Sequence, residues 1–143
     1  MNEEIINFYS ENAFELHDEQ QFSEWLKKVI SSEGKKTGEI SFIFCDDEYL
    51  LEINQKYLDH DTYTDIISFD DSLGKILQGD IFISTERVAE NAGTFQVNFE
   101  DELKRVMVHG ILHFAGFKDK SEEEKLVMRQ KEEEKMKMFH VEQ

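Results

Sequence analysis

Apolar residues follow two different spacings along the chain, and each spacing is typical of one kind of secondary structure. In residues 22–30, FSEWLKKVI, they recur every three or four positions, as on one face of a helix. In residues 39–45, EISFIFC, isoleucine and phenylalanine occupy alternate positions, as in a strand. The same spacings predict further strands at residues 4–10, 66–70 and 80–84, and further helices at residues 47–58, 85–95, 99–115 and from Ser121 onward. The pattern therefore predicts an α+β fold, with about four strands and about five helices.

The order of these elements predicts how the strands pair. The strand at 39–45, the helix at 47–58 and the strand at 66–70 form a strand–helix–strand unit, which predicts two parallel neighbours joined by a right-handed crossover. The link from 66–70 to the strand at 80–84 is short and suits an antiparallel neighbour. We therefore expect a mixed sheet with helices packed on it.

Two helix starts carry the signature of a capping box. Asp18 stands three residues before Gln21, ahead of the helix at 22–30, and Ser121 stands three residues before Glu124. We therefore expect both helices to begin with a side-chain cap. The helix that starts at Ser121 is rich in charged residues, and we expect it to be mostly solvated.

The helix predicted at 99–115 differs from the others because its second half, VMVHGILHFA, holds no Asp, Glu, Lys or Arg. A helix that is apolar all round is buried, so we expect it at the centre of the fold. Gly110 lies in its middle, where glycine costs about 1 kcal/mol relative to alanine. We expect another part of the molecule to approach the backbone there, and room beside the flanking histidines. Gly116 predicts the end of the helix.

Composition narrows the class of protein. The chain has 143 residues, of which 39% are hydrophobic, and this suits one folded domain over residues 1–143. It shows neither an apolar run of membrane-spanning length nor a signal peptide, and its single cysteine, Cys45, suits a reducing compartment, so we expect a cytoplasmic protein. The net charge of −16 argues against nucleic-acid binding through a broad basic face. No feature of the sequence predicts an oligomeric state.

His109 and His113 are the candidate chemistry of the central helix. Side chains four residues apart share a helix face, so both imidazoles can reach one ion, and Asp119 just beyond the helix is an acceptable third ligand. This set suits one divalent ion, Zn²⁺ first and other transition metals after it. The alternative is that both histidines are satisfied core residues and Asp119 an ordinary turn residue. Gly110 stands where H-E-x-x-H proteases carry their glutamate base, which argues against that chemistry.

Three stretches of the chain resemble the YbeY family. The hallmark H-G-x-L-H-x-x-G of that family is matched from His109 to Gly116. Its threonine–aspartate, apolar pair and Ser-Phe are matched by residues 64–69, and its Gly-Asp before a strand by Gly79 and Asp80. The stretches follow in the family's order over residues ~40–120, and that combination is specific.

The resemblance implies a metal-dependent endoribonuclease that acts in ribosomal RNA maturation and ribosome quality control, with rRNA and the ribosome or its proteins as partners and no membrane. It also implies a metal site at the end of the central helix, held by His109, His113 and Asp119. Two positions depart from the family. Asp119 stands where the third ligand is usually histidine, and Leu58 where the family often has a functional arginine.

The candidate substrate-binding residues lie around these motifs. If an arginine normally steadies a phosphate, its role is lost here or passes to another cationic side chain. The cationic candidates are Lys56, Arg105, Lys118 and Lys120. Asp65 and Ser68 are further candidates for substrate contact, and each of the six has the alternative of an ordinary surface or structural residue. His60 is a further candidate at the border of the cleft.

Three other functions stay open on the sequence alone. The chain can be a non-catalytic ribosome-associated factor with a structural metal, a metal-dependent hydrolase of another substrate such as a peptide, or a protein without a metal.

Overall fold

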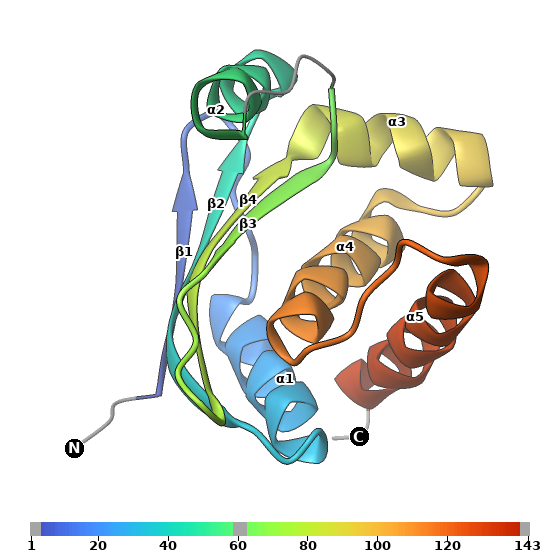
Figure 1. Cartoon of the computed structure of the whole chain (residues 1–143). Coiled ribbons are helices and arrows are strands. Elements are labelled where there is room, and N and C mark those ends of the chain that lie inside the picture. The colour runs from blue at the N-terminus through green and yellow to red at the C-terminus, as the bar shows by residue number, and fades with distance from the viewer. Residues whose placement is uncertain (1–3, 59–62, 141–143) are drawn as a thin grey trace.

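The chain folds into a four-stranded sheet with helices packed on its two faces (Figure 1). The computed structural model describes residues 4–58 and 63–140. In chain order the elements are β1 (Ile5–Ser10), α1 (Glu19–Ser32), β2 (Lys36–Cys45), α2 (Asp47–Leu58), β3 (Ile66–Asp70), β4 (Ile76–Ser84), α3 (Thr85–Phe95), α4 (Phe99–Phe114), α5 (Glu122–Met136) and a 3₁₀ helix (Lys137–His140). The predicted α+β class, with four strands and five α-helices, is confirmed.

The strands lie in the order β1-β2-β4-β3. The first three are parallel to one another, and β3 is antiparallel to β4, so the predicted mixed sheet and the antiparallel link between the last two strands are confirmed.

The predicted parallel pairing of residues 39–45 with 66–70 is wrong. The parallel neighbour of β2 on that side is β4, and β3 forms the edge of the sheet. Burial explains the choice, because β4 brings the fully buried Ile81 and Ile83 to the centre, whereas β3 is short and ends in an exposed Asp70. The more apolar strand takes the position covered on both sides.

Strand β4 begins at Ile76, four residues before the predicted start. The glycine at position 79 suggested a loop before residue 80. In the structure Gly79 pairs with Ile40 and Asp70 inside the sheet. Its φ of 144° is open to glycine, and a Cβ built there would stand 2.2 Å from the carbonyl oxygen of Phe69. Gly79 therefore permits the close approach of β3 and β4.

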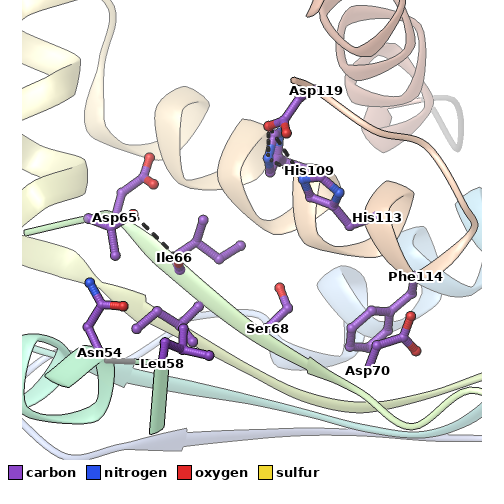
Figure 2. Close-up of a pocket in the computed structure, with 12 residues that line it drawn as sticks. Asn54, Leu58, Asp65, Ile66, Ser68, Asp70, His109, His113, Phe114 and Asp119 are labelled. Carbon is purple, nitrogen blue, oxygen red and sulfur yellow. Dashed lines mark hydrogen bonds and ion pairs between the residues drawn. The ribbon is translucent and has the colours of Figure 1, made fainter. Parts of the chain in front are cut away.

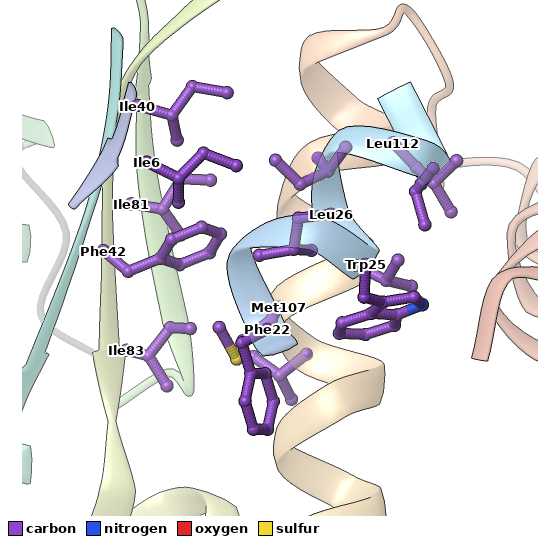
Figure 3. Close-up of a cluster of buried hydrophobic side chains, with 14 of the residues drawn as sticks. Ile6, Phe22, Trp25, Leu26, Ile40, Phe42, Ile81, Ile83, Met107 and Leu112 are labelled. Atoms are coloured by element: carbon purple, nitrogen blue, oxygen red, sulfur yellow. The ribbon is translucent and has the colours of Figure 1, made fainter. Parts of the chain in front are cut away.

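The main core lies between the sheet and the helices α1 and α4. Figure 3 shows Ile40, Phe42 and Ile81 of the sheet facing Leu26 of α1, and Met107 of α4 belongs to the same cluster. Side chains on the other face of the sheet, around Ile67, pack with Leu50 of α2. Burial on most sides of α4 confirms the predicted central helix. Within residues 4–58 and 63–140, no helix combines the length and apolar character needed to cross a membrane.

The sheet is what approaches α4 at Gly110. A Cβ at Gly110 would stand 3.1 Å from the Cδ1 atoms of both Ile66 and Ile81. The expected close approach is confirmed, but the space that glycine leaves is filled by these two isoleucines and does not open beside the histidines.

The two predicted capping boxes have opposite outcomes. Ser121 caps α5 with both reciprocal bonds to Glu124 present. Asp18 is the N-cap residue of α1, but it adopts a left-handed backbone with φ of 58°, and its side chain makes no capping hydrogen bond. The capping box at Asp18 and Gln21 is therefore wrong, because a side-chain cap needs an extended N-cap residue.

Candidate metal centre

Two imidazoles and one carboxylate converge beside the C-terminal half of α4 (Figure 2). His109 and His113 are one turn apart, and their Nε2 atoms are separated by 3.0 Å. The Oδ2 atom of Asp119 lies 3.2 Å from Nε2 of His109 and 3.4 Å from Nε2 of His113. The structure thus brings together the three residues that the sequence predicts as metal ligands.

A tight helix end brings Asp119 back to the histidines. The φ of Gly116 is 107°, and the N–H of Phe117 donates to the carbonyl oxygen of Leu112 at 3.0 Å. This left-handed turn reverses the chain just after α4. Asp119 therefore faces its own helix only three residues past the glycine.

The donor set fits one small divalent ion. Ligand atoms at about 2.1 Å around a tetrahedral Zn²⁺ stand roughly 3.4 Å from one another. The three atoms lie at 3.0, 3.2 and 3.4 Å, close to that spacing. Two imidazole nitrogens and one carboxylate oxygen suit zinc better than calcium or magnesium, which prefer oxygen ligands alone. All three side chains are partly exposed, which leaves a side of the site open to a ligand.

Glu132 of α5 holds His109 from the opposite side. Its Oε2 atom lies 2.6 Å from Nδ1 of His109, and the carboxylate is 2% exposed. A carboxylate accepts hydrogen bonds, so Nδ1 carries the proton and donates it. The lone pair of His109 then lies on Nε2, which faces Asp119 and His113. Such carboxylate–histidine pairs orient metal ligands in many metal sites.

Arg105 fixes Glu132 in turn. Its Nη1 atom donates to Oε1 of Glu132 at 3.1 Å, and its other nitrogens donate to the buried Glu102. Burial alone would lower the pKa of the guanidinium, but the hydrogen bond and charge of Glu102, with the charge of Glu132, raise it above its usual value. Arg105 therefore stays charged and keeps two buried carboxylates paired.

Glu132 is the residue of the site that sequence reasoning missed. The final helix is mostly solvated, as predicted, but Met128, Glu132 and Lys135 are buried on one face of α5. Their spacing of four and three residues is that of a buried helix face. The sequence did contain a signal for this residue. The capping box fixes where the helix starts, and Glu132 falls on the same helix face as the apolar Met128.

The three candidate ligands stand at one end of a pocket with a volume of about 710 Å³, which we call the β3 pocket. It is lined by Asn54, Leu58, Thr64, Asp65, Ile66, Ile67, Ser68, Asp70, His109, His113, Phe114 and Asp119. Two predicted substrate-binding residues, Asp65 and Ser68, lie there. Burial raises the pKa of Asp65 above its usual value, although the charges of Arg105 and His109 oppose the shift.

The cationic candidates lie elsewhere. Lys56, Lys118 and Lys120 are exposed and do not line the β3 pocket. Arg105 is engaged with Glu102 and Glu132, so its position favours a structural role over contact with a phosphate. Leu58 lines the β3 pocket, so the position where the resemblance implies a functional arginine supplies no charge here. His60 lies outside the described residues.

Comparison with known proteins gives one consistent answer. A family model described as Endoribonuclease YbeY matches residues 5–140. A protein of Christiangramia forsetii named Endoribonuclease YbeY is 66% identical over 138 residues, which cover 96% of this chain and 96% of the relative. A protein of Flavobacterium psychrophilum with the same name is 60% identical over 139 residues, covering 97% of this chain and 99% of the relative.

A solved structure has the same fold. The solution structure of TM1509 from Thermotoga maritima superposes with a TM-score of 0.68 at 25% sequence identity, covering 96% of this chain and 91% of that one. Family match, relatives and structure all extend over nearly the whole chain, and the chain therefore belongs to the YbeY family.

Proposed function

We propose that the chain is a metal-dependent endoribonuclease that hydrolyses RNA phosphodiesters, with one Zn²⁺ held by His109, His113 and Asp119. The convergence of these three side chains at the open end of the β3 pocket is the observation that carries the proposal. Membership of a family described as endoribonucleases supplies the substrate class.

The residues of the chain prepare the site for this reaction. His109 and His113 present their Nε2 atoms, and Glu132 holds the proton of His109 on Nδ1. A bound zinc ion supplies Lewis acidity and lowers the pKa of water at the site. Asp119 adds a negative charge to the ligand set, and Gly110 leaves no side chain that can act as a base next to His109. Asp65, which is partly buried and lines the β3 pocket, is a candidate to exchange a proton there.

The biological setting belongs to the same proposal. We infer that residues 1–143 act as one hydrolase domain in the cytoplasm, in ribosomal RNA maturation and ribosome quality control. Ribosomal RNA and the ribosome or its proteins are the proposed partners. The family description supports the RNA substrate.

Metal analysis and RNA cleavage test the proposal together. Purified protein is expected to carry one zinc per chain and to cleave rRNA fragments, and His113→Ala is expected to lose both properties. Protein without stoichiometric metal, or full nuclease activity in His113→Ala, would contradict the mechanism. Peptidase activity under the same metal-replete conditions would favour a different substrate.

One observation favours a second candidate, a ribosome-associated factor whose metal is structural. No Lys or Arg is among the described residues that line the β3 pocket. Under this alternative, Asp119→Ala still associates with ribosomes and rRNA processing continues, while removal of the metal unfolds the domain. Loss of processing with retained folding in Asp119→Ala would favour the endoribonuclease.

A further inference from the structure

Strand β3 is an edge strand, and its free edge borders the β3 pocket. The sheet order places β4 on one side of β3 and no strand of the described chain on the other. Residues 64–68 and Asp70 line the pocket, so the strand runs along it for its whole length. Figure 2 shows the Ser68 side chain pointing from β3 toward α4, which carries His109 and His113.

The hydrogen bonds to β4 fix which backbone groups face the pocket. The N–H of Ser84 donates to the carbonyl oxygen of Asp65, and the N–H of Asp71 donates to that of Gln78. In an antiparallel pair, alternate residues point their N–H and C=O groups toward the partner strand. The odd-numbered residues from Asp65 to Asp71 therefore bond to β4, and Ile66, Ser68 and Asp70 direct theirs outward. Ser68 is the middle one of the three.

The charge of the β3 pocket limits what these groups can bind. Asp65, Asp70 and Asp119 line it, and none of its lining residues is Lys or Arg. None of the described lining residues therefore supplies a Lys or Arg to hold an RNA phosphate inside the pocket. A nucleobase is neutral, and its Watson–Crick edge presents a hydrogen-bond donor next to an acceptor. A backbone N–H and C=O of one residue offer the matching pair.

We propose that the outward N–H and C=O of Ser68 hold an unpaired base of the RNA next to the metal centre. The proposal rests on the proposed endoribonuclease function and adds to it a backbone group that contacts the base, because a base offers this edge only when it is not paired. Ser68 acts as a positioning residue through its backbone.

Substitution by proline removes the N–H and leaves the pairing with β4 intact. Proline is tolerated on an edge strand where the N–H points away from the sheet. Ser10 in β1 is a matched control. The N–H of Glu11 donates to Phe44 of β2, so the N–H of the preceding Ser10 points outward from the opposite edge of the sheet, away from the β3 pocket.

The expected result is a loss in kcat/KM of roughly tenfold or more on a single-stranded RNA for Ser68→Pro, the effect of losing one substrate hydrogen bond of about 1.5 kcal/mol. Ser10→Pro is expected to cleave like the unchanged protein, and Ser68→Ala, which keeps the N–H, to lose much less than Ser68→Pro. Zinc affinity is expected to be the same in all variants. Equal cleavage by Ser68→Pro and Ser10→Pro would overturn the inference and leave the proposed function standing. Absence of RNA cleavage by the unchanged protein would contradict both the proposed function and the inference about Ser68.

Amide NMR of the zinc-loaded, unchanged protein tests the contact without a substitution. Nucleoside 5′-monophosphates carry a base and a phosphate but no phosphodiester to cleave. Their addition is expected to shift the Ser68 amide resonance and slow its solvent exchange, whereas the Ile67 amide, which faces β4, changes little. Shifts confined to residues around His109, or a Ser68 shift caused by an extended peptide and by no nucleotide, would overturn the inference.

Discussion

The proton position on His109 is set by a single buried carboxylate. Glu132 accepts from Nδ1, and Arg105 ties Glu132 to Glu102, so three charged side chains beneath the ligands fix one imidazole. Free histidine exchanges between two tautomers and rotates about its side-chain bonds. When the tautomer and the ring orientation are already fixed, binding an ion costs less conformational free energy.

Replacing Glu132 tests this link at the scale of one residue. Glu132→Gln is expected to weaken zinc binding by about 10–100-fold, since the amide can also present a donor to Nδ1 and no longer fixes the tautomer. A competitive chelator titration measures the affinity. The exposed neighbour Glu133→Gln is the control and is expected to bind zinc like the unchanged protein. Equal zinc affinity in the two variants would count against a positioning role for Glu132.

At the scale of elements, the hairpin of β3 and β4 determines where the β3 pocket forms. β4 occupies the buried centre, and β3 is left as an edge whose outer side is free. The hairpin depends on Gly79, where β4 passes close to the Phe69 carbonyl. The same glycine that hid the first four residues of β4 from sequence reading makes the hairpin possible.

Two glycine substitutions are expected to change stability in opposite directions. Gly79→Ala places a Cβ against the backbone of β3, where neither strand can yield cheaply, and is expected to cost more than about 2 kcal/mol. Gly93→Ala lies within α3, where a Cβ meets nothing within 4 Å, and is expected to stabilise the protein by up to about 1 kcal/mol. Urea unfolding of the two variants measures both values. Equal stabilities would refute the close packing at Gly79.

Two ion pairs to Glu33, the C-cap residue of α1, connect the C-terminal helix α5 to α1. Nζ of Lys135 lies 2.7 Å from Oε2 of Glu33, and Nζ of Lys131 lies 2.9 Å from the same oxygen. Burial tends to raise the pKa of Glu33, but the hydrogen bonds from Lys135 and Lys131 lower it below its usual value of 4.5. Folding therefore favours the ionised carboxylate.

This shift predicts how stability depends on pH. The contribution of Glu33 is fully present above the pKa of the unfolded chain, near 4.5, and is lost as pH falls through the lower folded pKa. Urea unfolding is expected to show a loss of about 1–2 kcal/mol from this pair in the acid range, a loss that is absent in Glu33→Gln. Glu24→Gln, at an exposed site of α1, is expected to keep the pH dependence of the unchanged protein. An identical acid profile in Glu33→Gln and the unchanged protein would contradict the assignment.

At the scale of the whole molecule, the charge of −16 opposes the approach of RNA. Proteins that bind nucleic acid through phosphate contacts lose affinity as salt rises, because binding releases counterions. The described residues that line the pocket include aspartates and neither Lys nor Arg, so screening by salt reduces repulsion more than it weakens attraction. The affinity of the proposed enzyme for RNA is therefore expected to rise, or to stay the same, as the salt concentration rises.

A kinetic series in monovalent salt tests that sign. Raising the salt from about 0.02 to about 0.15 M at fixed zinc is expected to lower the KM for a single-stranded RNA or leave it unchanged. The far-ultraviolet circular dichroism spectrum, recorded at each salt concentration, controls for changes in folding. A KM that climbs several-fold would reveal phosphate contacts outside the β3 pocket.

Local sequence determined much of this protein. The apolar spacing predicted every α-helix and strand, the capping box at Ser121 started α5 as expected, and the spacing of His109 and His113 marked the candidate ion site. These features depend on neighbours within about one helical turn or a few strand residues, so they can be predicted from the order of residues along the chain.

Tertiary structure decided the rest, because those features depend on residues far apart in the chain. The position of β4 between β2 and β3 follows from which strand buries more apolar surface, and Glu132 reaches His109 across 23 positions. Long-range packing likewise left Lys56, Lys118 and Lys120 outside the β3 pocket and turned the free edge of β3 into its wall. Spacing along the chain identifies which residues share a face, but only the packing of those faces places a partner opposite them.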